Sequence, residues 1–234
     1  MEKIKEEVPE KLRIAVLLSF ISGYINAFTY NNAGELFAGA QTGNVIFMAL
    51  HFAKGNLEKA VEFLIPIISF MIGQIFIYCF RNFFQRRGHK GYIHSSLLML
   101  FIMIALIIFL PFFDYHFIVV TLAFFAAIQS DTFQRLRGFS YATIMMTGNV
   151  KNAPRLLIEG LVQRDRELLV RGFLLFLIIF SFMLGVGIST YFTQFVKKSA
   201  LVPLILPLSY INYVLFKEEH SVIDVVKSKI RKIK

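Results

Sequence analysis

Tryptophan is absent from this sequence, cysteine occurs once, and charged residues make up only 17% of the chain. A single cysteine, Cys79, excludes an internal disulfide and any metal site built from several cysteines. With 56% hydrophobic residues and a mean hydropathy of +0.63, the chain carries more apolar surface than one soluble core of this size would bury. The composition therefore indicates a protein dissolved in a lipid bilayer.

Several sequence signatures of soluble chemistry are also missing. There is no phosphate-binding glycine-lysine loop, no nucleophile elbow and no dinucleotide fingerprint, and no pair of histidines has metal-ligand spacing on an established helix. The net charge of +10 does not predict nucleic-acid binding, because the basic residues lie between apolar blocks rather than in a stripe with interleaved aromatics. We therefore expect no ATP-driven transport, no hydrolase chemistry, no metal and no cofactor.

Apolar blocks are what the sequence has in abundance. Six of them are each roughly long enough to cross the ~30 Å hydrocarbon layer as a helix: Ile14–Tyr30, Val61–Phe80, Ser95–Phe113, Tyr115–Phe133, Gly172–Phe192 and Ser199–Phe216. The first block follows a mixed-charge head and lacks a small-residue cleavage site followed by a polar mature domain, so we expect a retained span. Tyrosines near the block ends are typical of an aromatic belt at the membrane surface.

Two short motifs occur twice, in the same order. Gln41–Val45, which contains Thr-Gly-Asn, recurs at Met146–Val150, and Ser69–Gly73 recurs at Ser181–Gly185. The offsets of 105 and 112 residues differ by an amount that a loop insertion would absorb. Internal repetition of this kind predicts two related halves. We place them at residues 12–113 and 114–216, followed by a basic cytoplasmic tail at 217–234.

The position of the Thr-Gly-Asn segments decides the architecture. If Leu36–Phe52 and Ser140–Gly160 do not cross the membrane, three spans per half make the halves inverted, whereas crossing segments give four spans and parallel halves. Eight spans double the number of basic residues outside the cytoplasm, while six spans leave only four there: Lys54, Lys59, Lys197 and Lys198. Six spans with both termini in the cytoplasm are therefore favoured, although Leu36–Phe52 is apolar enough to cross by itself.

Charge and glycine both indicate that the Thr-Gly-Asn segments are not ordinary spans. Lys151 and Arg155 follow the second motif closely, and a charge at the bilayer centre costs several kcal/mol. Glycine and asparagine both have low helix propensity, so we expect helix breaks at Gly43 and Gly148. The backbone groups freed by each break need protein or water as hydrogen-bond partners. The fold class predicted is an all-α transmembrane bundle of about six spans plus two short broken or re-entrant segments.

The polar side chains of the two motifs allow two interpretations. Thr42, Asn44, Thr147 and Asn149 either let helices pack closely and hydrogen-bond to one another, or bring broken helix ends of both halves around a small solute or ion. The sequence alone leaves both open.

Further polar residues lie inside apolar blocks. Asn26 is in the first block, and Asp131, the only acid well inside a block, follows Gln129 and Ser130. Counting back from the repeated threonines pairs Asn26 with Asp131, whereas aligning Gly23 with Ala127 pairs Asn26 with Ser130. An intramembrane acid is a functional candidate. Alternatively, Asp131 lies near the cytoplasmic end of its span and pairs with Arg135 at i+4 on one helix face.

These residues resemble the YoaK family of bacterial membrane proteins, which is grouped as a domain of unknown function. The likeness rests on Gly23–Ala27, the Asn32–Gly39 stretch, Gln129 and both Thr-Gly-Asn motifs. It implies a multi-pass protein of the bacterial cell membrane and no settled substrate. Family members commonly have aspartate where this chain has Asn26, so any coupling of transport to protons or cations would differ here or pass to Asp131.

The repeat and the two polar helix breaks favour a small secondary transporter or exporter of an unknown solute or ion, with the lipid bilayer as its other partner. A non-transporting scaffold or sensor is the alternative. An intramembrane enzyme comes third, because Asp131, His116 and Glu62 offer no catalytic pairing. The expected substrate-binding residues are Asn26, Thr42, Gly43, Asn44, Gln129, Asp131, Thr147, Gly148 and Asn149.

Overall fold

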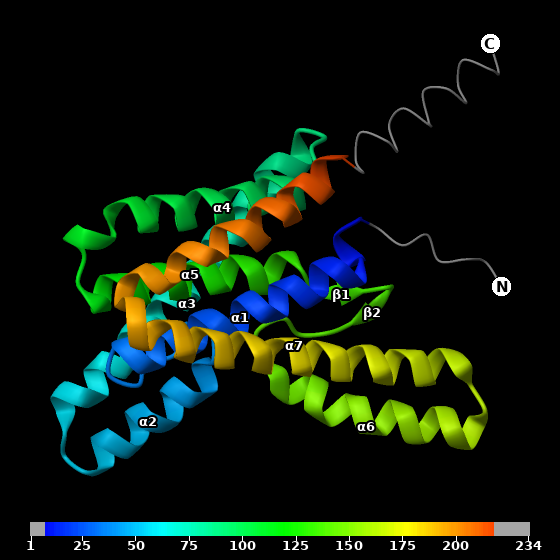
Figure 1. Cartoon of the computed structure of the whole chain (residues 1–234), viewed down its shortest axis with the longest axis horizontal. Helices are drawn as coiled ribbons and strands as arrows, with labels where there is room; N and C mark the ends of the chain where they lie inside the picture. Colours follow the sequence, from blue (N-terminus) through cyan, green and yellow to red (C-terminus); the bar gives the residue numbers. More distant parts are fainter. Residues whose placement is uncertain (1–7, 218–234) are drawn as a thin grey trace.

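The computed structural model describes residues 8–217, which are almost entirely helical (Figure 1). The labelled helices are α1 (Leu12–Asn32), α2 (Gln41–Ala53), α3 (Leu57–Arg86), α4 (Gly91–Phe109), α5 (Tyr115–Thr132), α6 (Met146–Gln163) and α7 (Arg166–Val196). Short 3-10 turns are η1 (Val8–Glu10), η2 (Leu110–Phe112) and η3 (Lys197–Leu204), and a last helix follows over residues 205–217. The predicted all-α class is confirmed, while the basic tail beyond Lys217 lies outside the described residues.

One small sheet interrupts the helices of the described chain. Strands β1 (Arg135–Leu136) and β2 (Phe139–Ser140) form an antiparallel hairpin between α5 and α6, with Arg135 opposite Ser140. The turn between them uses positive φ angles at Arg137 and Gly138. The hairpin packs against η1, where Gly138 N–H donates to the Glu10 carboxylate at 2.7 Å.

Four helical segments are long and apolar enough to span a membrane: Leu12–Asn32, Leu57–Arg86, Gly91–Phe112 and Arg166–Lys217. The last of these is 52 residues long and contains α7, η3 and the final helix. Many bulky apolar side chains on these helices face outward, as at Ile75, Phe101 and Phe173. Outward apolar faces of this extent are expected where lipid rather than water surrounds the helices. The chain is therefore a membrane protein, and its number of spans stays a prediction.

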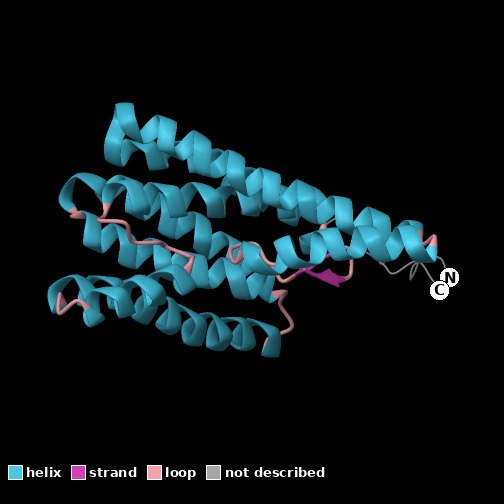
Figure 2. Ribbon diagram, turned by 90° about the horizontal axis from the view of Figure 1, so that it is seen from below, coloured by secondary structure: helices cyan, strands magenta, loops and turns pink. Residues whose placement is uncertain are grey.

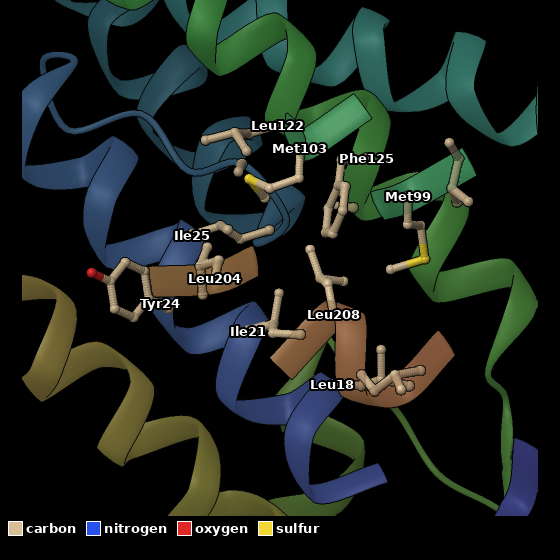
Figure 3. Close-up of a cluster of buried hydrophobic side chains, with 14 of the residues drawn as sticks. Leu18, Ile21, Tyr24, Ile25, Met99, Met103, Leu122, Phe125, Leu204 and Leu208 are labelled. Atoms are coloured by element: carbon tan, nitrogen blue, oxygen red, sulfur yellow. The ribbon is translucent and has the colours of Figure 1, made fainter. Parts of the chain in front are cut away.

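The core lies around α1 and α5. Nearly three quarters of the most apolar stretch of α1 is buried, and α5 is buried on most of its faces. Figure 3 shows how side chains of α1, α4, α5, η3 and the final helix interdigitate: Leu18, Ile21, Tyr24, Ile25, Met99, Met103, Leu122, Phe125, Leu204 and Leu208. Helices that are apolar on all sides suit this central position because other helices cover them.

Glycines of the repeated Ser-Phe-Met motif lie at two helix crossings. A Cβ atom at Gly185 of α7 would lie 2.1 Å from the carbonyl oxygen of Phe20 in α1, and one at Gly73 of α3 would lie 3.2 Å from that of Phe124 in α5. Small residues let membrane helices approach this closely. Both crossings therefore depend on the absence of a side chain at the same position of the motif.

Serines of the same motif make matching hydrogen bonds. Ser181 Oγ donates to the carbonyl of Val16 at 2.8 Å, and Ser69 Oγ donates to that of Val120 at 2.7 Å. Val16 and Val120 are 104 residues apart, like Phe20 and Phe124. The same offset takes Asn26 to Ser130, so these contacts favour Ser130 over Asp131 as the counterpart of Asn26.

Two segments turn back into the bundle before their helices begin. Residues 33–40 lead from the end of α1 to α2, and residues 141–145 lead from the hairpin to α6. Both helices start near the middle of the molecule and run to opposite ends (Figure 1). Figure 2 shows loop segments lying among the helices. The two segments touch, since a Cβ atom at Gly39 would lie 2.5 Å from Cγ2 of Ile144.

The predicted helix breaks at Gly43 and Gly148 are wrong in position. Gly43 and Gly148 lie in the first turns of α2 and α6, and the non-helical backbone precedes both motifs. The first turn of a helix has N–H groups without intrahelical partners in any case, so glycine disturbs little there. What fixes the break is the following asparagine, which bonds backward to the loop.

Candidate functional site

The asparagine of each Thr-Gly-Asn motif holds the loop seven residues before it. Asn44 Oδ1 accepts from Phe37 N–H at 2.9 Å, and its Nδ2 donates to Phe37 C=O at 2.8 Å. Asn149 makes the same two bonds with Ala142, at 3.2 and 2.7 Å. Both asparagines are buried. Because buried backbone groups need internal partners, each clamp stabilises a loop that lies among the helices.

Asn26 holds the first loop from the side of α1. Its Oδ1 accepts from the N–H groups of Gly39 and Ala40 at 2.9 and 3.0 Å, and its Nδ2 donates to the carbonyl of Ser22 at 2.8 Å. One turn further along α1, Thr29 Oγ1 accepts from Ala38 N–H at 3.0 Å. The first loop is therefore hydrogen-bonded at nearly every residue that faces α1.

The second loop has fewer partners. The buried hydroxyls of Tyr141 and Thr143 have no hydrogen-bond partner within residues 8–217. A Cβ atom at Gly148 would meet nothing within 4 Å, whereas one at Gly43 would lie 2.9 Å from the Phe37 ring. The start of α6 is thus open where the start of α2 is packed.

Gln129 links the two central helices. Its Nε2 donates to the carbonyl of Leu18 at 3.0 Å and to Ser22 Oγ at 2.7 Å, so α5 is joined to α1 one turn before Asn26. Its side chain is fully buried, and Oε1 has no partner in the described part of the chain. An unpaired buried acceptor of this kind is costly unless a donor reaches it.

Asp131 lies in an ion pair at the end of α5. Arg81 of α3 donates through Nη1 to the carboxylate at 2.7 Å and to the Asp131 carbonyl at 2.8 Å. The predicted pairing with Arg135 at i+4 is wrong, because α5 ends at Thr132 and Arg135 belongs to β1. Sequence reasoning missed Arg81, whose only signal is its place directly after an apolar block.

Cavities lie at both ends of the bundle. The first has a volume of about 420 Å³, and its wall includes Glu10, Arg81, Asp131 and Arg135. The second, of about 470 Å³, lies where α1 and α7 end and α5 begins; its wall includes Asn31, Thr190, Thr193 and Lys197. Asn31 Nδ2 donates to Thr190 Oγ1 there at 3.1 Å. One cavity is therefore bordered by charge pairs and the other mainly by neutral polar groups.

The nine predicted site residues do not form a single cluster. Asn26 and Gln129 are close together, both bonding to Ser22. Asn44 and Asn149 bond to their own loops, Asp131 lines the first cavity, and Thr42 and Thr147 are exposed. Among residues 8–217, no group of three or more His, Cys, Asp or Glu side chains is arranged to hold a metal ion.

Comparison with known proteins identifies the family without assigning an activity. No curated protein and no solved structure matches the chain. The family model described as "Protein of unknown function (DUF1275)" matches residues 14–213, and the chain therefore belongs to the DUF1275 family.

Proposed function

We propose that this chain is a small secondary transporter or exporter of the bacterial cell membrane, related to YoaK, with six spans in two inverted halves. The observation that carries the proposal is the meeting of two re-entrant loops, clamped alike by Asn44 and Asn149, between cavities at opposite ends of the bundle. Broken helices that start near the midplane and face one another are typical of transporter binding sites.

The helix starts support one class of solute. α2 and α6 both begin where Gly39 and Ile144 touch, and helix N-termini carry partial positive charge and free N–H groups. These groups favour a small solute with negative charge or hydrogen-bond acceptors. Thr147 and Gly148, at the open start of α6, are the residues we expect the solute to contact.

Opposite directions of α1 and α5 support the inverted arrangement, because the start of α1 and the end of α5 share the first cavity, while the end of α1 and the start of α5 share the second. α1 and α7 run in the same direction, because Val16 bonds to Ser181 and, further along, Asn31 bonds to Thr190. The equivalent pair α5 and α3 also runs in one direction, from the Val120 bond to the Asp131 bond. Three spans per half then place the cytoplasm at the end that carries the Arg81 and Asp131 pair.

Alternating access requires each cavity to open toward the junction in turn. The Arg81–Asp131 pair joins α3 to α5 at the cytoplasmic cavity, and the Asn31–Thr190 bond joins α1 to α7 at the other. We propose that these two contacts close the cavities alternately as the two halves rock against each other.

Flux through purified protein in liposomes tests the proposal. A metabolite panel rich in small anions should reveal one solute whose flux falls in Gly148→Ala, because the added methyl group narrows the open start of α6. Gly187→Ala is the matched control, since a Cβ at Gly187 on the exposed face of α7 also meets nothing within 4 Å. Absence of flux for every solute, or equal effects of both variants, contradicts a site at the junction.

One observation favours the scaffold alternative. The amide groups of Asn44 and Asn149 are committed to the chain's own backbone, which is a structural role for two of the predicted site residues. If Gly148→Ala and Thr147→Val leave all flux and growth phenotypes unchanged while Asn149→Ala lowers stability, the motifs serve packing alone.

A further inference from the structure

The outer face of the last turns of α3 carries a cavity that the proposed transport path does not use. Its volume is about 450 Å³, and its lining residues are Cys79, Asn82, Phe83, Arg86 and Arg87. All of them belong to α3 or to its C-cap, so the cavity lies on the surface of this one helix and not between helices. It lies at the end of a helix long enough to span the membrane.

The two arginines of this cavity differ from other arginines of the chain. Arg81, Arg155 and Arg171 each have a carboxylate oxygen within 3.2 Å. Arg86 and Arg87 are exposed, and neither has an acidic partner within ion-pair distance among the described residues. Two adjacent guanidinium groups without a carboxylate are suited to bind a phosphate, whose oxygens match the planar fork of donors.

An aromatic ring holds one of these arginines in place. The guanidinium carbon of Arg87 lies 4.0 Å from the ring centre of Phe83, one turn earlier on the helix. A cation over an aromatic face is attracted to it, and the contact limits the conformations of the side chain. Arg87 therefore has a defined position before any ligand arrives.

An apolar stripe leads from the arginines toward the middle of α3. Ile75, Cys79 and Phe83 follow at intervals of four residues and so lie on one helix face. Ile75 is 68% exposed and Phe83 48% exposed, and Cys79 is exposed as well. A charged head region above an outward apolar stripe matches the shape of a phospholipid, with its phosphate at the membrane surface and its acyl chains below.

We propose that this face of α3 is a binding site for an anionic phospholipid. The phosphate lies between Arg86 and Arg87, and one acyl chain lies along Ile75, Cys79 and Phe83. The anionic cytoplasmic leaflet attracts basic groups at this depth, and basic cavities on membrane helices bind such head groups. The site stands apart from the re-entrant junction and rests only on the proposed topology, which puts this end of α3 at the cytoplasmic leaflet.

Native mass spectrometry of the full chain, exchanged between phosphatidylglycerol and phosphatidylcholine, tests the site. We expect preferential retention of phosphatidylglycerol by the unmodified chain. Removing both arginines in Arg86→Ala/Arg87→Ala should weaken that binding by about 25-fold, from about fivefold for each basic group. Arg164→Ala/Arg166→Ala is the control, because it removes two exposed arginines from the same end of the bundle.

Three results would overturn the proposal. Equal retention of phosphatidylglycerol by the unmodified chain and the Arg86/Arg87 variant shows that these arginines bind no head group. An equal loss in the Arg164/Arg166 variant shows diffuse attraction to a basic surface. Competition by inorganic phosphate as strong as by the lipid shows an anion site without an acyl-chain contact. Since Arg86 and Arg87 are exposed, the variant is expected to fold, which a gel-filtration profile checks.

Discussion

The two loops that precede the Thr-Gly-Asn motifs are held very differently. Residues 33–40 are tied to α1 through Asn26 and Thr29 as well as to Asn44, whereas residues 141–145 have the Asn149 clamp and two buried hydroxyls without partners in the described chain. At the positions 104 residues after Asn26 and Thr29 stand Ser130 and Phe133, and Ser130 accepts from Gln74 rather than bonding to the loop. A repeated motif therefore preserves the clamp, while the surrounding helix decides how firmly the loop is fixed.

This difference predicts separate roles for the two loops. The first loop changes conformation only by breaking the hydrogen bonds that Ala38, Gly39 and Ala40 make with α1 and those that Phe37 makes with Asn44, each costing about 1–3 kcal/mol. The second loop has unpaired hydroxyls and an open helix start, so it breaks fewer hydrogen bonds when it changes conformation. We expect the first loop to be the fixed wall of the junction and the second to be the part that moves.

Asn26→Leu should have the largest effect on stability. It removes the acceptor for the N–H groups of Gly39 and Ala40, and leaving both buried and unpaired is expected to cost about 2–5 kcal/mol. Ser130→Ala, at the matching position of the second half, removes one hydroxyl and should cost about 1 kcal/mol. Thermal unfolding in detergent compares the two variants, and equal losses would show that the halves are held alike.

Removing either asparagine clamp, Asn44 or Asn149, should have the second largest effect on stability. Asn44→Ala and Asn149→Ala each leave a half-buried backbone N–H and C=O pair without its side-chain partner, with an expected cost of about 1–3 kcal/mol. Asn44 should be the more costly, because it also donates to Gln41 Oε1 and its bond to Phe37 N–H is 0.3 Å shorter than the matching bond of Asn149. A larger loss for Asn149 in the same unfolding assay would reverse the assignment of fixed and moving loops.

The smallest effects on stability are expected for alanine substitutions of the two motif glycines, and these two effects should be opposite in sign. Gly43→Ala pushes a methyl group against the Phe37 ring and should destabilise the chain slightly. Gly148→Ala meets open space and gains helix propensity, so it should be neutral or stabilising by up to about 1 kcal/mol. A loss of stability in both variants would contradict an open start of α6.

The sequence predicts the helices better than their contacts. All six apolar blocks lie in helical segments, because a run of apolar residues this long has no stable alternative to a helix in lipid. Each Thr-Gly-Asn motif lies at a helix start where its asparagine bonds to the preceding loop, while the relatedness of the two halves stays a prediction. The position of each break was not predictable, because it depends on how far back the side chains of Asn44 and Asn149 reach.

Hydrogen bonds and ion pairs between helices were the second feature that the sequence did not predict. Spacing along the sequence pairs Asp131 with Arg135, whereas the structure pairs it with Arg81. Arg81 is the partner because α5 ends at Thr132, before Arg135, and because α3 packs against α5. Thr29 has no threonine at its matching position, which Phe133 occupies. Nothing in the sequence therefore marks Thr29 as a partner of the first loop. Such choices depend on tertiary packing rather than on local pattern.

The central claim, that the Thr-Gly-Asn segments enter the membrane without crossing it, is tested most directly by cysteine labelling. In a Cys79→Ser background, Lys54→Cys and Lys90→Cys are treated with a membrane-impermeant thiol reagent in intact cells. Six spans in inverted halves predict labelling at position 54 from outside and at position 90 only after the cells are opened. Labelling of position 90 from outside, with position 54 protected, would mean that the segments cross and that the halves are parallel.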